Sequence, residues 1–109
     1  MALPHPLTDD LAELIARRFR VVSEPMRIRL LDRLRDGEST VGELADSLGA
    51  SQQNVSKHLA VLADAGVVAR RKDGNHVHYR IADTGVLKLC ETVCGSLERQ
   101  ARQLAKIVA

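Results

Sequence analysis

The chain has 109 residues, of which 45% are hydrophobic and 2% aromatic, and its net charge is +2. This length is that of one domain, and a core of leucine, valine, isoleucine and alanine favours helices. No apolar run approaches the roughly 18 residues of a membrane span, and the N-terminus has neither region of a signal peptide. We therefore expect a cytoplasmic protein with no membrane partner.

The charge is unevenly distributed along the chain. Every charged residue between Asp36 and Gly49 is acidic, whereas residues 51–82 carry five lysines and arginines against two aspartates. The basic charge therefore gathers in one half of the middle of the chain.

Two helices are predicted at the start of the chain. Thr8 can cap the first of them, and the two aspartates that follow face the positive end of the helix dipole. Its apolar face runs from Leu11 to Val22. The second helix begins around Pro25, a residue tolerated in the first turn, and ends at Asp36 and Gly37.

A pair of short helices is predicted next. Thr40 and Glu43 form a capping box at the start of the first, which ends at Gly49, a residue that adopts the left-handed conformation at low cost. Ser51 caps the next helix only two residues later. Two helices joined by a tight turn containing glycine form a helix-turn-helix.

The second helix of this pair, residues 51–65, has a polar beginning and an apolar remainder. Val55, Leu59 and Leu62 have the spacing of a core face, but the first turns are otherwise polar. This separation indicates that a partner outside the protein contacts the polar end.

From Val67 the apolar period changes to two, which predicts a β-hairpin of residues 67–72 and 76–81 with Asp73 and Gly74 at its tip. After Asp83 a long helix runs to the end of the chain. Its apolar seam alternates steps of three and four residues, which indicates a partner surface; it comprises Leu87, Cys90, Cys94, Leu97, Ala101, Leu104 and Val108.

The expected fold is therefore mainly α (α+β), a winged helix-turn-helix with about five helices and one hairpin wing. We expect residues 1–109 to form a single DNA-binding domain with dimerisation helices at both ends. Three segments, residues 23–34, 41–68 and 70–81, resemble the ArsR/SmtB-type bacterial repressors in order and separation. The resemblance implies a small homodimer that binds double-stranded operator DNA and often releases it when a metal ion binds.

The polar end of the 51–65 helix has the residue types that read DNA. The first turns of a recognition helix enter the major groove, where Gln and Asn can bond adenine, Lys can bond guanine or phosphate, and Ser can bond bases or backbone. The candidate DNA-binding residues here are Ser51, Gln52, Gln53, Asn54, Ser56, Lys57 and His58. The resemblance favours Gln52, Gln53, Ser56 and Lys57. For His58, packing against the core is an equal alternative.

The hairpin supplies a second set of candidates, Arg71, Lys72 and Asn75. Its resemblance to the family's wing implies contact with phosphates or the minor groove. A solvated edge strand would carry the same charges, because lysine and arginine also protect exposed edges.

Two metal sites known in such repressors lack their ligands here. One uses Cys-x-Cys in the third helix, where this chain has Thr40, Val41 and Gly42. Another takes histidine from the terminal helix, and no histidine follows Tyr79.

Cys90 and Cys94 are the remaining candidates for a metal site. They lie four residues apart on the terminal helix, so a twofold dimer with paired terminal helices would bring four thiols near its axis. Thiolates suit zinc, cadmium, copper or trivalent arsenic as an inducer. Two other interpretations stay open: cysteine as a small packing residue, and a redox switch.

The sequence thus predicts a dimeric, sequence-specific transcriptional repressor that a thiophilic metal or metalloid bound at Cys90 and Cys94 could release from its operator. The alternative is a winged-helix regulator without a metal response, controlled by oxidation, a partner or its own abundance. An enzyme is not expected, because Cys-x-x-x-Cys lacks the spacing of thioredoxin-type motifs, and no catalytic triad, P-loop or zincin motif occurs.

Overall fold

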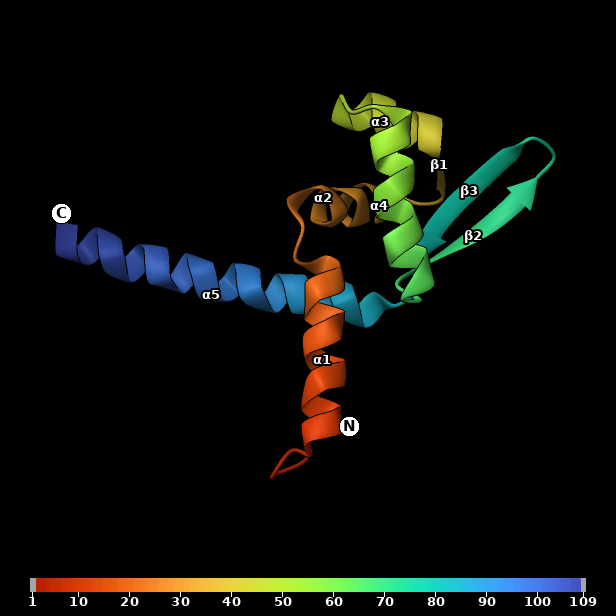
Figure 1. Ribbon diagram of the computed structural model, residues 1–109. Helices are drawn as coiled ribbons and strands as arrows, with labels where there is room; N and C mark the ends of the chain where they lie inside the picture. Colours follow the sequence, from red (N-terminus) through yellow and green to blue (C-terminus); the bar gives the residue numbers. More distant parts are fainter. Residues whose placement is uncertain (1, 109) are drawn as a thin grey trace.

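A computed structural model describes residues 2–108. Five helices and three strands follow one another in this part of the chain (Figure 1). In chain order they are α1 (Asp9–Val22), α2 (Pro25–Leu34), β1 (Ser39–Thr40), α3 (Val41–Leu48), α4 (Gln52–Asp64), β2 (Val68–Asp73), β3 (His76–Ile81) and α5 (Thr84–Val108). The expected winged helix-turn-helix is confirmed.

The helix ends lie where the capping residues predict them. The Thr8 hydroxyl accepts a hydrogen bond from the Leu11 amide at 3.2 Å, and the Ser51 hydroxyl accepts one from the Asn54 amide at 3.1 Å. Each bond satisfies an amide that has no partner within its helix. α3 ends at Gly49, whose φ of +62° places it in the left-handed region.

The sheet is larger than the sequence predicts. Its strand order is β1-β3-β2, with antiparallel pairing throughout. The hairpin was expected, but β1 was not: Ser39 pairs with Tyr79 and Thr40 with His78. The pairing of Asp73 with His76 leaves Gly74 and Asn75 as the two turn residues.

The core lies where α2, α3 and α4 meet the base of the sheet. Its most deeply buried side chains are Leu30, Leu31, Leu44, Val55, Leu59, Leu62 and Val67. Each buried leucine contributes roughly 1.5–3 kcal/mol relative to an exposed one. Because Val55 and Leu59 are both 0% exposed, they fix the rotation of α4 and direct its polar residues outward.

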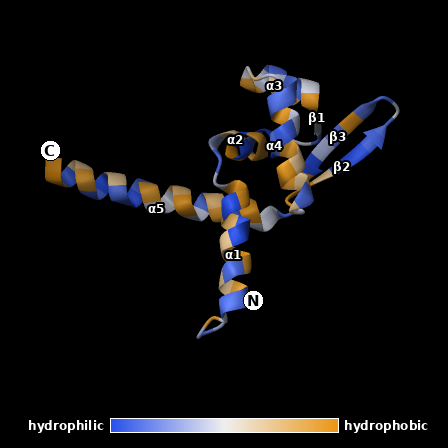
Figure 2. Ribbon diagram, viewed as in Figure 1, coloured by the Kyte–Doolittle hydropathy of each residue, from blue (hydrophilic) through white to orange (hydrophobic). Residues whose placement is uncertain are grey.

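The first and last helices project from this core (Figure 1). Figure 2 shows hydrophobic residues recurring along the whole of α5, whereas the wing is mostly hydrophilic. Val86 is the one residue of α5 described as buried, and the exposed fractions of Leu97 and Leu104 are 59% and 60%. Phe19 in α1 is 50% exposed. Beyond its first turns, the apolar seam of α5 is therefore left uncovered by the rest of residues 2–108.

Candidate nucleic-acid interface

The polar end of α4 is presented to solvent. Six of its seven predicted DNA-binding residues are exposed: Ser51, Gln52, Gln53, Asn54, Ser56 and Lys57. Four of these line a shallow hollow: Ser51, Gln53, Asn54 and Lys57. His58 is half-buried, as expected for a residue between the polar end and the core.

The wing projects toward the same end of the molecule. In Figure 1 the N-terminal end of α4 and the β2–β3 tip both lie at the top, whereas the N-terminal end of α1 lies at the bottom. The two predicted DNA-binding elements, the start of α4 and the wing, therefore lie at the same end of the molecule. Asn75 is exposed in the wing turn.

The strand register places the two predicted wing cations on opposite faces. Arg71 is opposite His78, whereas Lys72 is opposite Val77. Neighbouring residues in a strand point to opposite faces, so the Arg71 and Lys72 side chains project from different faces of the wing. Among the described residues, Lys57, Arg70, Lys72 and Arg80 make no ion pair within 4.0 Å.

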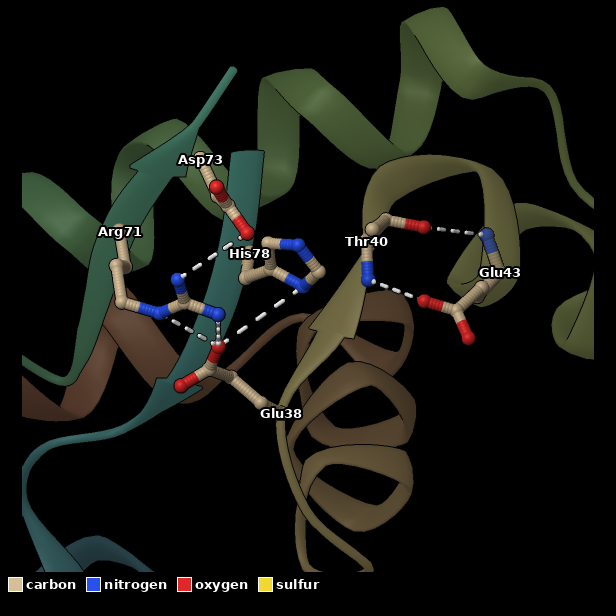
Figure 3. A network of polar contacts seen from close by, with 6 residues as sticks. All are labelled: Glu38, Thr40, Glu43, Arg71, Asp73 and His78. Atoms are coloured by element: carbon tan, nitrogen blue, oxygen red, sulfur yellow. Dashed lines mark hydrogen bonds and ion pairs between the residues drawn. The ribbon is translucent and has the colours of Figure 1, made fainter. Parts of the chain in front are cut away.

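Arg71 is paired with acidic residues (Figure 3). Its Nε and Nη2 atoms both donate to Oε1 of Glu38, at 3.0 and 2.6 Å. Its Nη1 atom lies 3.7 Å from Oδ2 of Asp73, and Nδ1 of His78 lies 3.8 Å from the same Glu38 oxygen. The hydrogen bond from Arg71 lowers the pKa of Glu38 below its ordinary value, and the charges of Arg71, His78 and Arg80 act in the same direction.

The start of α3 lies beside this group. The Thr40 amide donates to Oε1 of Glu43 at 3.0 Å, and the Thr40 hydroxyl accepts from the Glu43 amide at 3.2 Å. These bonds to Thr40 lower the pKa of Glu43. Because Thr40 also ends β1, the capping box joins the helix-turn-helix to the sheet.

Sequence reasoning missed Glu38. The sequence did contain one signal. Glu38 lies in the wholly acidic stretch of residues 36–49, whose charge is opposite to that of the basic hairpin. The two-residue strand that brings Glu38 to the hairpin is too short to show an apolar period, so the pairing could not be assigned.

Cys90 and Cys94 both line a groove of about 590 Å³ between α2 and α5. Cys90 is half-buried and Cys94 is exposed. Ile28, Leu31 and Leu87 form part of the apolar lining, and Arg29, Asp32, Arg35, Glu91 and Glu98 the charged part. Within residues 2–108 no three His, Cys, Asp or Glu side chains gather as a metal-binding group.

No helix in the described range is long and apolar enough to cross a membrane.

A family model described as a helix-turn-helix domain matches residues 22–71. The HTH-type transcriptional regulator KmtR of Mycobacterium tuberculosis is 38% identical over 86 residues, covering 79% of this chain and 66% of that protein. The repressor SmtB of the same species is 36% identical over 80 residues, covering 73% and 59%.

Solved structures match over more of their length. Rv0081 of M. tuberculosis has a TM-score of 0.76 and 38% identity, covering 94% of this chain and all of that one. The chain belongs to the ArsR/SmtB family of winged helix-turn-helix transcriptional regulators. Mb0332 of Mycobacterium bovis, described as a homodimeric winged helix-turn-helix domain and a possible ArsR-family regulator, has a TM-score of 0.73 at 28% identity, covering 90% and 91%.

Two further members of the family are named for heavy elements. A probable mercury resistance operon repressor of Streptomyces lividans is 40% identical over 74 residues, covering 68% of this chain and 59% of the relative. The antimony-specific repressor AntR has a TM-score of 0.72 at 32% identity, covering 94% and 98%. The matches to KmtR, SmtB and the mercury repressor span less than two thirds of each relative. The family is one of DNA-binding transcriptional regulators.

Proposed function

We propose that the protein is a homodimeric transcriptional repressor that reads an operator in double-stranded DNA through α4. The observation that carries this proposal is the exposed polar beginning of α4, held outward by the buried Val55 and Leu59. The expected readers are Ser51, Gln52, Gln53, Asn54, Ser56, Lys57 and His58, with Arg71, Lys72 and Asn75 contacting the backbone or minor groove from the wing. Base contacts then give specificity, and phosphate contacts give affinity and position.

The homodimer forms through α1 and α5. Leu14 and Phe19 of α1 and Leu97 and Leu104 of α5 are all at least half exposed. An apolar seam of this length is characteristic of a helix that pairs with another. In this proposal residues 1–109 act as one DNA-binding domain whose two terminal helices provide the dimer contacts.

The proposed inducer is a thiophilic ion held by Cys90 and Cys94. The two thiols line the same groove, and thiolates bind zinc, cadmium, copper and trivalent arsenic in preference to hard cations. Two thiols are too few for a tetrahedral site. Pairing of α5 with its twofold copy supplies the second pair. The relatives named for mercury and antimony support a ligand of this class.

The test is a DNA-binding titration of the purified dimer with zinc, cadmium, copper(I) or arsenite. The effective ion should weaken operator binding by about 1–3 kcal/mol, the usual range of allosteric coupling. Cys90→Ser and Cys94→Ser should each abolish this response and leave DNA binding without the ion unchanged. Thr92→Ser is the matched control, since Thr92 lies between the cysteines and its hydroxyl donates to the Lys88 carbonyl of its own helix.

A response that survives in the double cysteine variant would place the inducer site elsewhere. If none of these ions changes operator binding, the protein is a repressor without a metal response. Failure of the wild-type protein to bind any duplex would contradict the proposal as a whole.

A further inference from the structure

The group formed by Glu38, Arg71, Asp73 and His78 on the wing has no part in the proposed reading of bases (Figure 3). It joins the segment before α3 to both strands of the hairpin. We propose that the Glu38 carboxylate occupies the phosphate-binding edge of Arg71 in the free protein, and that DNA binding exchanges this carboxylate for a backbone phosphate. This inference rests on the proposed contact between the wing and DNA.

The geometry of the pair is the first support. Nε and Nη2 form one edge of the guanidinium, and both donate to a single Glu38 oxygen at 3.0 and 2.6 Å. Arginine offers this same fork to carboxylates and to phosphates. A phosphate therefore cannot use that edge until Glu38 leaves it.

The charge around Arg71 is the second support. The remaining amino group, Nη1, lies 3.7 Å from Asp73, so two carboxylates surround one guanidinium. The attraction between Arg71 and an approaching phosphate is accordingly offset in the free protein. Arg70, Lys72 and Arg80 differ, because among the described residues they have no acidic partner within 4.0 Å.

The exposure of the pair makes the exchange feasible. The side chains of Arg71 and Glu38 are 49% and 31% exposed. Ion pairs open to water contribute little to stability, so a phosphate held nearby by other contacts can displace the carboxylate. Glu38 itself is held in place by the backbone, because the next two residues pair with β3. Glu38 therefore sets how strongly Arg71 contributes to DNA affinity.

The experiment measures binding to a fluorescein-labelled duplex of random sequence by anisotropy. Glu38→Gln should tighten binding about two- to fivefold, the factor that corresponds to releasing one exposed ion pair. Asp36→Asn is the matched control, since Asp36 is a nearby acid without an ion pair among the described residues. It removes the same charge and should tighten binding less than Glu38→Gln does.

A double-mutant cycle separates exchange from a general charge effect. In an Arg71→Ala background, Glu38→Gln should improve binding no more than Asp36→Asn does. Equal tightening with and without Arg71, no tightening, or weaker binding of Glu38→Gln would each overturn the exchange. These results differ from failure of the proposed function, in which the wild-type protein binds no duplex.

A second measurement follows Arg71 in the wild-type protein itself and needs a variant only to assign one signal. The Nε–H signal of Arg71 in a nitrogen–proton NMR spectrum, assigned by its loss in Arg71→Ala, reports the partner of that donor. Addition of the duplex should move this signal away from its free position. An Arg71 signal that stays in place at saturating DNA would show that Glu38 keeps the guanidinium, and would overturn the proposal.

Discussion

At the scale of single residues, reading of bases depends on which side chains α4 directs outward. Gln53 and Ser56 are three positions apart and are therefore neighbours on the helix surface. Both are exposed, and Val55 between them is fully buried. Because Val55 is anchored in the core, α4 has little freedom to rotate, so these two side chains keep a fixed orientation toward solvent, where the proposed operator would bind.

Gln53→Ala or Ser56→Ala should weaken binding to the operator by roughly 1–3 kcal/mol, because each removes a contact to a base edge. Binding to random DNA should change little, since phosphate contacts remain. Arg71→Ala is the comparison: it should weaken both complexes and reduce the log–log salt slope by about one. If Gln53→Ala weakens random DNA as much as operator DNA, Gln53 is not a base reader.

The acidic groups beside α3 give the fold a defined response to acid. Their partners lower the pKa values of Glu38 and Glu43 in the folded protein below the ordinary carboxylate value of 4.5. The unfolded chain therefore binds protons first as the pH falls, and the stabilisation is lost as the pH falls through the folded pKa values. It is fully present above the unfolded pKa.

Urea unfolding followed from neutral to acidic pH should show this loss. The decline should be shallower in Glu43→Gln, because one of the two shifted groups is absent. Asp46→Asn is the control and should follow the wild type, because Asp46 lies in the same helix and its carboxylate makes no ion pair among the described residues. Identical curves for Glu43→Gln and wild type would contradict the assignment.

At the scale of elements, helix ends that depend only on residues close together in the sequence were predicted well. The capping hydroxyls of Thr8, Thr40 and Ser51 each bond an amide of their own helix, so their effect can be recognised within four residues of sequence. β1 was missed, because its two residues become a strand only through pairing with β3, distant along the chain.

The predicted site was limited in the same way. The residues of α4 were placed by their own helix period, but the partner of Arg71 depends on a contact between residues 33 positions apart. A pattern among neighbouring residues carries no information about a contact between residues so far apart in the sequence. The sequence likewise could not show that α2 completes the groove beside Cys90 and Cys94.

The turn between α3 and α4 gives a test at this scale. Gly49→Ala should destabilise the fold by about 1–2 kcal/mol, because φ is +62° there and an L-residue pays this cost in the left-handed region. Gly42→Ala is the matched control. Its added methyl would meet Gln52 at 3.6 Å, an ordinary contact, so it should be neutral or stabilising. Equal losses in urea unfolding would contradict the role of the Gly49 conformation.

At the scale of the whole molecule, the apolar faces of the projecting helices α1 and α5 are exposed, and the proposed partner is a second copy of the chain with the same faces. Sedimentation should therefore show a dimer at micromolar concentration. Leu97→Glu combined with Leu104→Glu should shift it toward monomer, because both side chains are more than half exposed in the single chain and would be buried in the dimer. Lys88→Glu, a charge change of an exposed α5 residue, should leave the dimer intact. A wild-type monomer would refute this arrangement.

A homodimer with one reading helix per subunit must recognise a site with matching symmetry. Two copies of α4 are expected to enter successive major grooves on one side of the duplex, about one helical turn apart. In the proposed complex the wings would lie over the flanking backbone, where the proposed exchange between Glu38 and phosphate would set affinity but not sequence preference. The proposal therefore assigns specificity and affinity to different elements of the same surface.

The most direct test is selection of bound duplexes from a random-sequence pool, followed by sequencing. The proposed function predicts enrichment of an imperfect palindrome whose half-sites are about 10 base pairs apart, centre to centre. Gln53→Ala should lose preference at one position in each half-site. Folded wild-type protein that enriches no motif, or a motif without twofold symmetry, would contradict the proposed homodimeric operator-binding repressor.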